Sequence, residues 1–182
     1  AAAGQHSGLG LLCGGLLQAA GASGSMSFRG VIFPRERQMG AERKPVESWL
    51  TDMDGVLVHE GLPVPGAPEF INRLRSSGKP FLILTNNSIY TPRDLHARLS
   101  RMGFEVPESA IWTAALATAQ FLSDQRPGGT AYVIGEAGLT TAMHAVGYIL
   151  SDYDPDYVVL GETRTYSFEA ITKAVRLIND GA

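Results

Sequence analysis

The chain has 182 residues, of which 45% are hydrophobic and 18% charged, and its formal net charge is −3. This length and composition suffice for one sizeable domain with a packed core, or for two small ones. The scattered basic residues argue against a nucleic-acid partner, and the single cysteine, Cys13, excludes a disulfide framework and a cysteine-based zinc site. We therefore expect a cytoplasmic globular protein.

Residues 1–44 differ in composition from the rest of the chain. Ala, Gly and Leu dominate their first half, and the apolar run 9–20 is shorter than the about 20 residues that span a bilayer. A signal peptide would have an early basic residue, whereas the first one here is Arg29. We expect a disordered or artefactual extension and no membrane partner, with a targeting segment as the alternative. Met39 as the initiator is a hypothesis.

The chain from Pro45 to Gly103 predicts two strands and two helices. SWLTDMD (48–54) and KPFLILTNN (79–87) are typical of short buried strands. A loop rich in Gly and Pro follows the first strand, and the next helix has its apolar face at residues 70, 71 and 74. Thr91 is placed to cap the second helix, and Asp94 to complete a capping box.

Strands and helices continue to alternate towards the C-terminus. A helix is predicted over residues 113–124, with Trp112 and Leu122 on its apolar side. TAYVIG (130–135) and DYVVLG (156–161) indicate strands, and a helix that Gly147 ends lies between them. The spacing of Ile171 to Ile178 predicts the most clearly amphipathic helix. This alternation favours an α/β fold with a parallel sheet, whose ligands bind at the carboxyl ends of its strands.

Two aspartates close the first predicted strand. In TDMDG, Asp52 and Asp54 can reach one pocket if the strand ends near Asp52 and the chain turns at Gly55. Carboxylates and exposed carbonyls are hard oxygen donors that suit Mg²⁺, which would orient a phosphate and screen its charge. One aspartate could attack the phosphoryl group while the other transfers protons. The alternative is a solvated strand-to-loop junction.

A second polar cluster closes the next strand. Thr85, Asn86, Asn87 and Ser88 follow an apolar run, and Thr85 lies 33 residues after Asp52, which leaves room for one loop and one crossover helix. A hydroxyl and successive backbone N–H groups there would bind a phosphate oxygen. The alternative is a turn held by asparagine side chains. Together, the two clusters predict a phosphate site.

These motifs resemble a known family. DMDGVL, LTNNS, YVIGEAGL and VVLGETRTYSFEAI are similar to segments of the haloacid dehalogenase (HAD) superfamily, in the subfamily of NagD-like and nitrophenyl phosphatases. The resemblance covers residues 45–182. It implies an α/β fold with a Rossmann-like parallel-sheet core and an inserted α/β cap. The N-terminal part of the core would occupy residues 45–127, and a partial cap, truncated within itself, residues 128–182.

The resemblance also implies roles for individual residues. Asp52 would be the nucleophile and a Mg²⁺ ligand. Asp54 would be the general acid and base, and would bind Mg²⁺ through its backbone carbonyl. Thr85 and the backbone of Asn86 would hold the transferring phosphate. The expected phosphate-binding residues are Gly55, Thr85, Asn86 and Asn87.

The function implied is a Mg²⁺-dependent phosphomonoesterase that acts through an aspartyl-phosphate. Its substrate would be a small phosphorylated metabolite, such as a nucleotide, a sugar phosphate or pyridoxal phosphate. The lysine motif and the later acidic motif of the family do not follow, and SDYDPDY (151–157) is better explained as a turn. We therefore expect the N-terminal portion of a longer phosphatase.

Other classes stay open at this stage. A non-catalytic phosphate- or metal-binding fragment, or an inactive HAD-like protein, is the main alternative, and a homo-oligomer is compatible with either. A nucleotide-cofactor oxidoreductase is disfavoured because VIGEAGL (133–139) lacks the complete G-x-G-x-x-G spacing.

Overall fold

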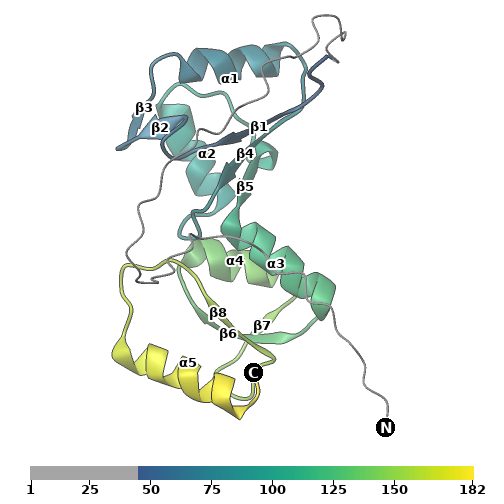
Figure 1. Cartoon of the computed structure of the whole chain (residues 1–182), viewed down its shortest axis with the longest axis vertical. Helices are drawn as coiled ribbons and strands as arrows, with labels where there is room; N and C mark the ends of the chain where they lie inside the picture. The colour runs from purple at the N-terminus through teal and green to yellow at the C-terminus, as the bar shows by residue number, and fades with distance from the viewer. Residues whose placement is uncertain (1–44) are drawn as a thin grey trace, which may run out of the picture. The chain divides into compact units, whose positions relative to one another are not determined.

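The computed structural model describes residues 45–182 (Figure 1). The expectations for residues 1–44, including Met39, lie outside the described residues. The elements in chain order are β1 (Trp49–Asp52), β2 (Val58–His59), β3 (Leu62–Pro63), α1 (Ala67–Ser76), β4 (Phe81–Thr85), α2 (Pro92–Arg101), the 3₁₀ turn η1 (Glu108–Ala110), β5 (Ile111–Thr113), α3 (Ala114–Gln125), β6 (Thr130–Ile134), α4 (Ala137–Ala145), β7 (Ile149–Leu150), β8 (Tyr157–Leu160) and α5 (Phe168–Asp180).

The first sheet has the order β1-β4-β5, and both of its pairings are parallel. Asp52 of β1 is opposite Leu84, and Thr85 of β4 is opposite Thr113 of β5. The carboxyl ends of the three strands therefore meet at one edge of the sheet. This arrangement confirms the prediction that the two polar clusters follow neighbouring strands.

Helices α1 and α2 cover one face of this sheet. Their buried side chains, which include Ile71 and Leu99, form one hydrophobic cluster with Ile83 of β4 and Ile111 of β5. The predicted cap of α2 is confirmed, because the Thr91 hydroxyl accepts from the Asp94 N–H and the Asp94 carboxylate accepts from the Thr91 N–H. The cap and the apolar spacing together explain why α2 begins at Pro92.

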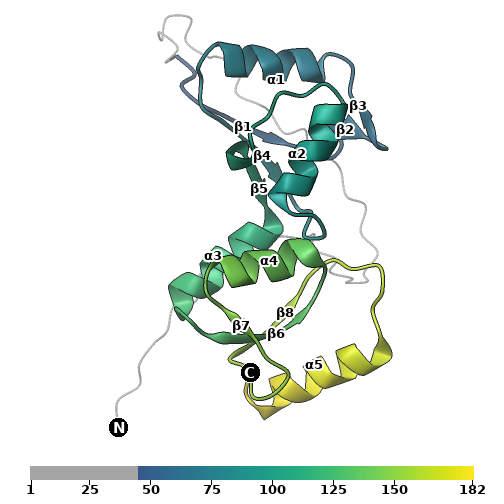
Figure 2. The same ribbon diagram turned by 180° about the vertical axis from the view of Figure 1, so that it is seen from behind.

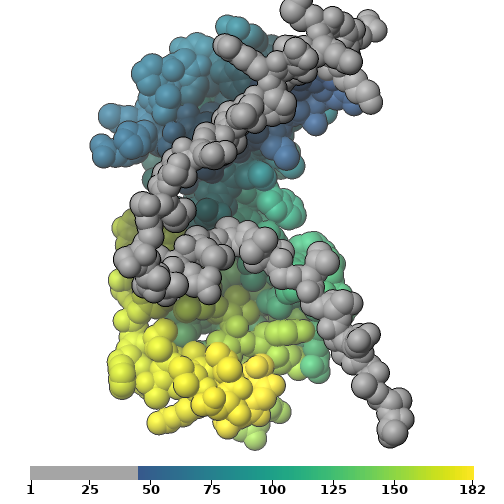
Figure 3. Space-filling view, viewed as in Figure 1, coloured from purple at the N-terminus to yellow at the C-terminus, as the bar shows by residue number. Residues whose placement is uncertain are grey.

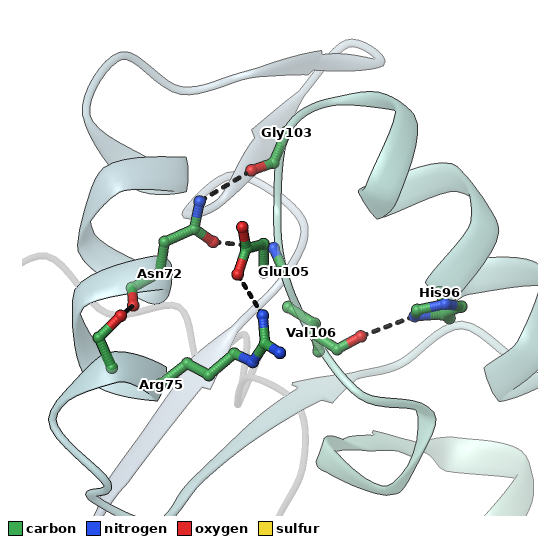
Figure 4. Close-up of polar contacts among 7 residues, drawn as sticks. Asn72, Arg75, His96, Gly103, Glu105 and Val106 are labelled. Atoms are coloured by element: carbon green, nitrogen blue, oxygen red, sulfur yellow. Dashed lines mark hydrogen bonds and ion pairs between the residues drawn. The ribbon is translucent and has the colours of Figure 1, made fainter.

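Polar contacts tie α1 to the segment that follows α2 (Figure 4). The Asn72 side chain donates to the Gly103 carbonyl at 3.0 Å and accepts from the Glu105 N–H at 2.8 Å. Arg75 forms an ion pair with Glu105, and His96 Nδ1 lies 2.6 Å from the Val106 carbonyl. His96 therefore has a packing role.

The other face of the first sheet is open in the described part of the chain. Leu50, Leu84 and Trp112 point to that side and are 67%, 36% and 41% exposed. The sequence predicted β1 and β4 to be buried strands, yet each alternates between covered and exposed positions. The reason is that residues 45–182 supply helices for one face only of this sheet.

The second sheet lies between helices on both of its faces. Its order is β7-β6-β8 with parallel pairings, and α3 and α4 share a hydrophobic cluster with Ala131 and Val159 of the sheet. Figures 1 and 2 show α5 on the opposite side of this sheet from α3 and α4. Both sheets confirm the predicted α/β fold with parallel strands.

Helix α5 packs on the second sheet through a narrow row of side chains. Ala174 is buried, whereas Ile171, Val175 and Ile178 are 37%, 52% and 54% exposed. Figure 3 shows the atoms of α5, in yellow, at the surface. The apolar spacing thus correctly predicted a helix, but the side that meets the sheet is centred on Ala174.

Helix α3 belongs with the second cluster. The sequence assigned it to the core part, residues 45–127, and began the cap at 128. Ala115, Ala119 and Leu122 of α3 instead pack with α4 and β6. The boundary stays a prediction, and this packing favours a position nearer 113/114. None of the helices described for residues 45–182 is long and apolar enough to cross a membrane.

Candidate active site

The candidate site begins where β1 ends. Asp52 is the last residue of the strand, and its Oδ1 accepts a hydrogen bond from the Met53 N–H at 2.8 Å. The chain then turns, because the N–H groups of Leu57 and Val58 both donate to the Met53 carbonyl. Gly55 has a φ of +81°, a value that favours glycine and allows this turn. Met53 is buried beneath it, which leaves both aspartates at the surface.

Asp54 is linked directly to the second polar cluster. The buried Thr85 hydroxyl donates to Asp54 Oδ2 at 3.1 Å, across 31 residues of sequence. The same hydroxyl accepts from the Asn87 N–H at 3.1 Å. Thr85 therefore fixes the Asp54 carboxylate relative to the loop after β4. This contact brings together residues that the sequence predicted to share a site.

The loop after β4 is a turn organised by Asn87. Its side-chain oxygen accepts from the Ile89 N–H at 3.1 Å and from the Tyr90 N–H at 2.9 Å. This is the asparagine-held turn that the sequence offered as the alternative to a phosphate loop. The two interpretations are compatible, because an ordered turn of this kind presents backbone N–H groups in a fixed direction. Asn86, next to Thr85, is exposed.

Gly55 has a contact that bears on its predicted role. Its N–H donates to the Val58 carbonyl at 2.8 Å, within the turn that follows β1. A phosphate oxygen could accept from this N–H only if that bond were released. The positive φ of Gly55 is thus accounted for by the turn alone, and its part in phosphate binding stays a prediction.

The two aspartates line different cavities. Asp52, Thr85, Asn86 and Thr113 lie along a cavity of about 410 Å³ at the strand ends. Asp54 and Asn87 lie along another of about 210 Å³, together with Met53, Val58, Glu60, Gly61, Ile89, Tyr90, Leu95, Arg98, Leu99, Met102, Glu162 and Arg164. The sequence expected both carboxylates in one pocket. The turn after Asp52 carries Asp54 to the second cavity, and Thr85 connects the two.

The oxygen atoms at this edge fit Mg²⁺ in part. Asp52 offers an exposed carboxylate, and in the described part of the chain the Asp54 carbonyl accepts no backbone hydrogen bond. Both are hard donors, and Mg²⁺ usually keeps several waters beside one or two carboxylates. Residues 45–182 contain no group of three or more His, Cys, Asp or Glu that could hold a metal ion by itself.

Sequence reasoning missed three residues near these cavities. Thr113 closes β5, a strand of three residues that is too short to produce a recognisable pattern before α3 begins. Glu162 and Arg164 follow β8 and enter the cavity of Asp54 from 74 or more residues beyond Ser88. No local signal in GETRT indicates that approach. The late acidic segment behaves as predicted, since residues 152–154 form a bend.

Comparison with known proteins gives the family of the chain. Residues 49–149 match the family model for haloacid dehalogenase-like hydrolases. A dihydroxyacetone phosphatase from Corynebacterium glutamicum is 60% identical over 135 residues, which are 74% of this chain and 49% of the relative. The chain thus spans about half the length of the curated relatives it matches.

Solved structures give the same result. NagD from Escherichia coli K-12 matches with a TM-score of 0.72 and 38% identity over 76% of this chain and 55% of its own. A p-nitrophenyl phosphatase from Archaeoglobus fulgidus matches with a TM-score of 0.69 and 34% identity over 74% of this chain and 52% of its own. The chain belongs to the haloacid dehalogenase-like hydrolases, within the NagD and nitrophenyl phosphatase subfamily.

Proposed function

We propose that this chain carries the nucleophile and the phosphate loop of a Mg²⁺-dependent phosphomonoesterase. The observation that supports the proposal best is the bond from the Thr85 hydroxyl to Asp54, because it joins the two polar clusters at neighbouring strand ends. The chain spans about half the length of its relatives, so the proposal concerns the activity of the protein in which this segment works.

In this proposal, Asp52 attacks the phosphorus atom with one carboxylate oxygen. The Met53 N–H, which donates to Asp52 Oδ1, orients that carboxylate. Asp54 transfers a proton to the leaving oxygen, and later accepts one from the water that hydrolyses the aspartyl-phosphate. Thr85 holds Asp54 in place, and the loop at Asn86 and Asn87 receives the phosphate oxygens. Bound Mg²⁺ would neutralise part of the phosphate charge.

We propose a small hydroxylated phosphate as the substrate. The relative with 60% identity is named a dihydroxyacetone phosphatase, while NagD, at 39% identity, is named a ribonucleotide monophosphatase. The cavity beside Asp54 has a volume of about 210 Å³ and is lined by charged groups that include Glu60, Arg98 and Arg164. A three-carbon sugar phosphate suits a polar cavity of this size better than a nucleotide.

The test compares the 182-residue chain with a chimera. The chimera continues residues 1–182 into the segment that follows the matched region of the C. glutamicum relative. We expect the chimera to release phosphate from dihydroxyacetone phosphate with Mg²⁺, and to lose turnover with a chelator or with Asp52→Asn. Full activity of Asp52→Asn would remove Asp52 as the nucleophile.

A non-catalytic phosphate- or metal-binding fragment is the second candidate. The ordered turn at Asn87 favours phosphate binding in this second function, because such a turn presents backbone N–H groups in a fixed direction whether or not catalysis follows. The same comparison separates the two functions. The catalytic proposal expects the chimera to be far faster than the 182-residue chain, whereas a chimera as inactive as the chain would favour the binding function.

A further inference from the structure

Ser88 is a buried residue that contacts a distant turn. It follows Asn87 directly, and its side chain is among the few polar ones buried in residues 45–182, with 7% exposed. Its hydroxyl oxygen accepts a hydrogen bond from the Glu162 N–H at 2.8 Å, across 74 residues of sequence. A buried hydroxyl is costly to leave without a hydrogen-bond partner, so this bond holds the two segments together.

A second contact also fixes the loop after β4 to a distant part of the chain, and we call these two contacts the Ser88 junction. The Gly138 N–H, at the start of α4, donates to the Ile89 carbonyl at 2.8 Å. A Cβ atom at position 138 would lie 2.6 Å from the Tyr90 carbonyl oxygen and 2.7 Å from that of Ser88. Only glycine allows this approach of the two backbones. The loop after β4 is thus fixed at two points, to the start of α4 and to the turn after β8.

The turn held by Ser88 brings two charged residues to the edge of the candidate site. Glu162 and Arg164 line the same cavity as Asp54 and Asn87. A further hydrogen bond holds this turn to the residue before α4, since the Thr163 hydroxyl donates to Glu136 Oε1 at 2.5 Å. Within residues 45–182, Arg164 has no ion-pair or hydrogen-bond partner, so its guanidinium is available to a ligand in this cavity.

We propose that Ser88 is a positioning residue for substrate selection. It fixes the turn 161–164 relative to the phosphate loop, so that Arg164 donates hydrogen bonds to oxygen atoms of the leaving group. Ser88 itself contacts no reacting atom. This inference rests on the proposed phosphatase function and adds to it a specificity residue, Arg164, for oxygen-rich leaving groups.

Hydrogen exchange of the 182-residue chain tests the positioning role without any turnover. We expect Ser88→Ala to accelerate exchange of the Glu162 amide by about tenfold, because its acceptor is lost. Gly138→Ala places a Cβ atom against the Ser88 and Tyr90 carbonyl oxygens, and should also accelerate exchange of the Glu162 amide. Ser76→Ala is the matched control, since Ser76 is an exposed serine of α1. An unchanged exchange rate of the Glu162 amide in Ser88→Ala would overturn the proposal.

Kinetics of the chimera test whether Ser88 acts through Arg164. With dihydroxyacetone phosphate, we expect Arg164→Ala and Ser88→Ala each to raise KM by about tenfold. With phenyl phosphate, whose leaving group carries no oxygen besides the ester oxygen, KM should rise far less, because Arg164 then has no hydrogen-bond acceptor to lose. The double variant should be no worse than Arg164→Ala alone, because both changes remove one interaction.

The outcomes separate the two proposals. Additive losses in the double variant, or equal losses with both substrates, would overturn the role of Ser88 in selection. A chimera without turnover would contradict the proposed function instead, and the exchange of the Glu162 amide would then decide whether Ser88 positions the turn.

Discussion

Thr85 is the residue on which the geometry of the candidate site depends most. Its buried hydroxyl donates to Asp54 and accepts from the Asn87 N–H, so one side chain orders both polar clusters. The sequence predicted Thr85 as a phosphate ligand from its place at a strand end. It could not predict the contact with Asp54, because that contact depends on how the chain turns after Asp52.

Replacing Thr85 tests this arrangement. We expect Thr85→Val, which keeps the shape but removes the hydroxyl, to lower the free energy of unfolding by about 1–3 kcal/mol. The reason is that the Asn87 N–H loses its acceptor. Urea denaturation measures the change, and Thr85→Ser, which keeps the hydroxyl, is the control. A valine variant as stable as the original chain would show that these bonds do not order the loop.

Asp156, just before β8, forms hydrogen bonds with Thr130 at the start of β6, and the pKa of its carboxyl is lowered. The Thr130 N–H donates to Asp156 Oδ2 at 2.7 Å, and this bond holds the pKa of the carboxyl below its ordinary value. The Thr130 hydroxyl and the Arg126 guanidinium lower the pKa further. A lowered pKa means that the carboxylate stabilises the fold above the unfolded pKa of about 3.9. The contribution is lost as the pH falls through the folded pKa.

The pH dependence of stability checks this assignment. We expect Asp156→Asn to unfold at a lower urea concentration than the original chain near pH 7. The difference should begin to narrow below the unfolded pKa of about 3.9, and should vanish as the pH falls through the lower folded pKa, where the native carboxyl of the original chain becomes protonated. Asp152→Asn controls for the removal of an acid from the same loop. A difference that is constant down to about pH 3 would contradict the role given to Asp156.

At the scale of elements, local signals predicted those helices and strands whose pattern is complete within a few residues. The Thr91 cap, the polar ends of β1 and β4, and the helical spacing around Ile171 are examples. The local signals did not predict those strands whose conformation depends on packing against other parts of the chain. No strand was predicted at β5, which has three residues, and its last residue, Thr113, was assigned to the start of a helix. β2 and β3 lie in a segment predicted to be a loop.

Helix α2 gives a prediction at this scale. We expect Thr91→Ala to lower the free energy of unfolding by about 1 kcal/mol, because the cap of the helix is lost. Thr91→Ser retains the oxygen that accepts from the Asp94 N–H, so its free energy of unfolding should fall very little. Urea denaturation of the three proteins measures the difference. Equal losses for alanine and serine would mean that the hydroxyl does not cap α2.

At the scale of the whole molecule, residues 45–182 contain two hydrophobic clusters, one for each three-stranded sheet. The sequence predicted the parallel α/β arrangement and a division into two parts. It assigned α3 to the first part, because the small side chains of Ala115 and Ala119 give no sign of the neighbours against which they pack. The junction at Ser88 is likewise invisible in sequence, since its partner is 74 residues away.

The proposed mechanism requires that Asp52 becomes phosphorylated, and trapping the phosphorylated protein tests this step. The chimera is mixed with dihydroxyacetone phosphate and Mg²⁺, quenched with acid and digested, and its peptides are analysed by mass spectrometry. We expect a phosphoryl group on Asp52 and none on the Asp52→Asn variant. Turnover without this adduct, or a phosphoryl group on another residue, would contradict the proposed mechanism.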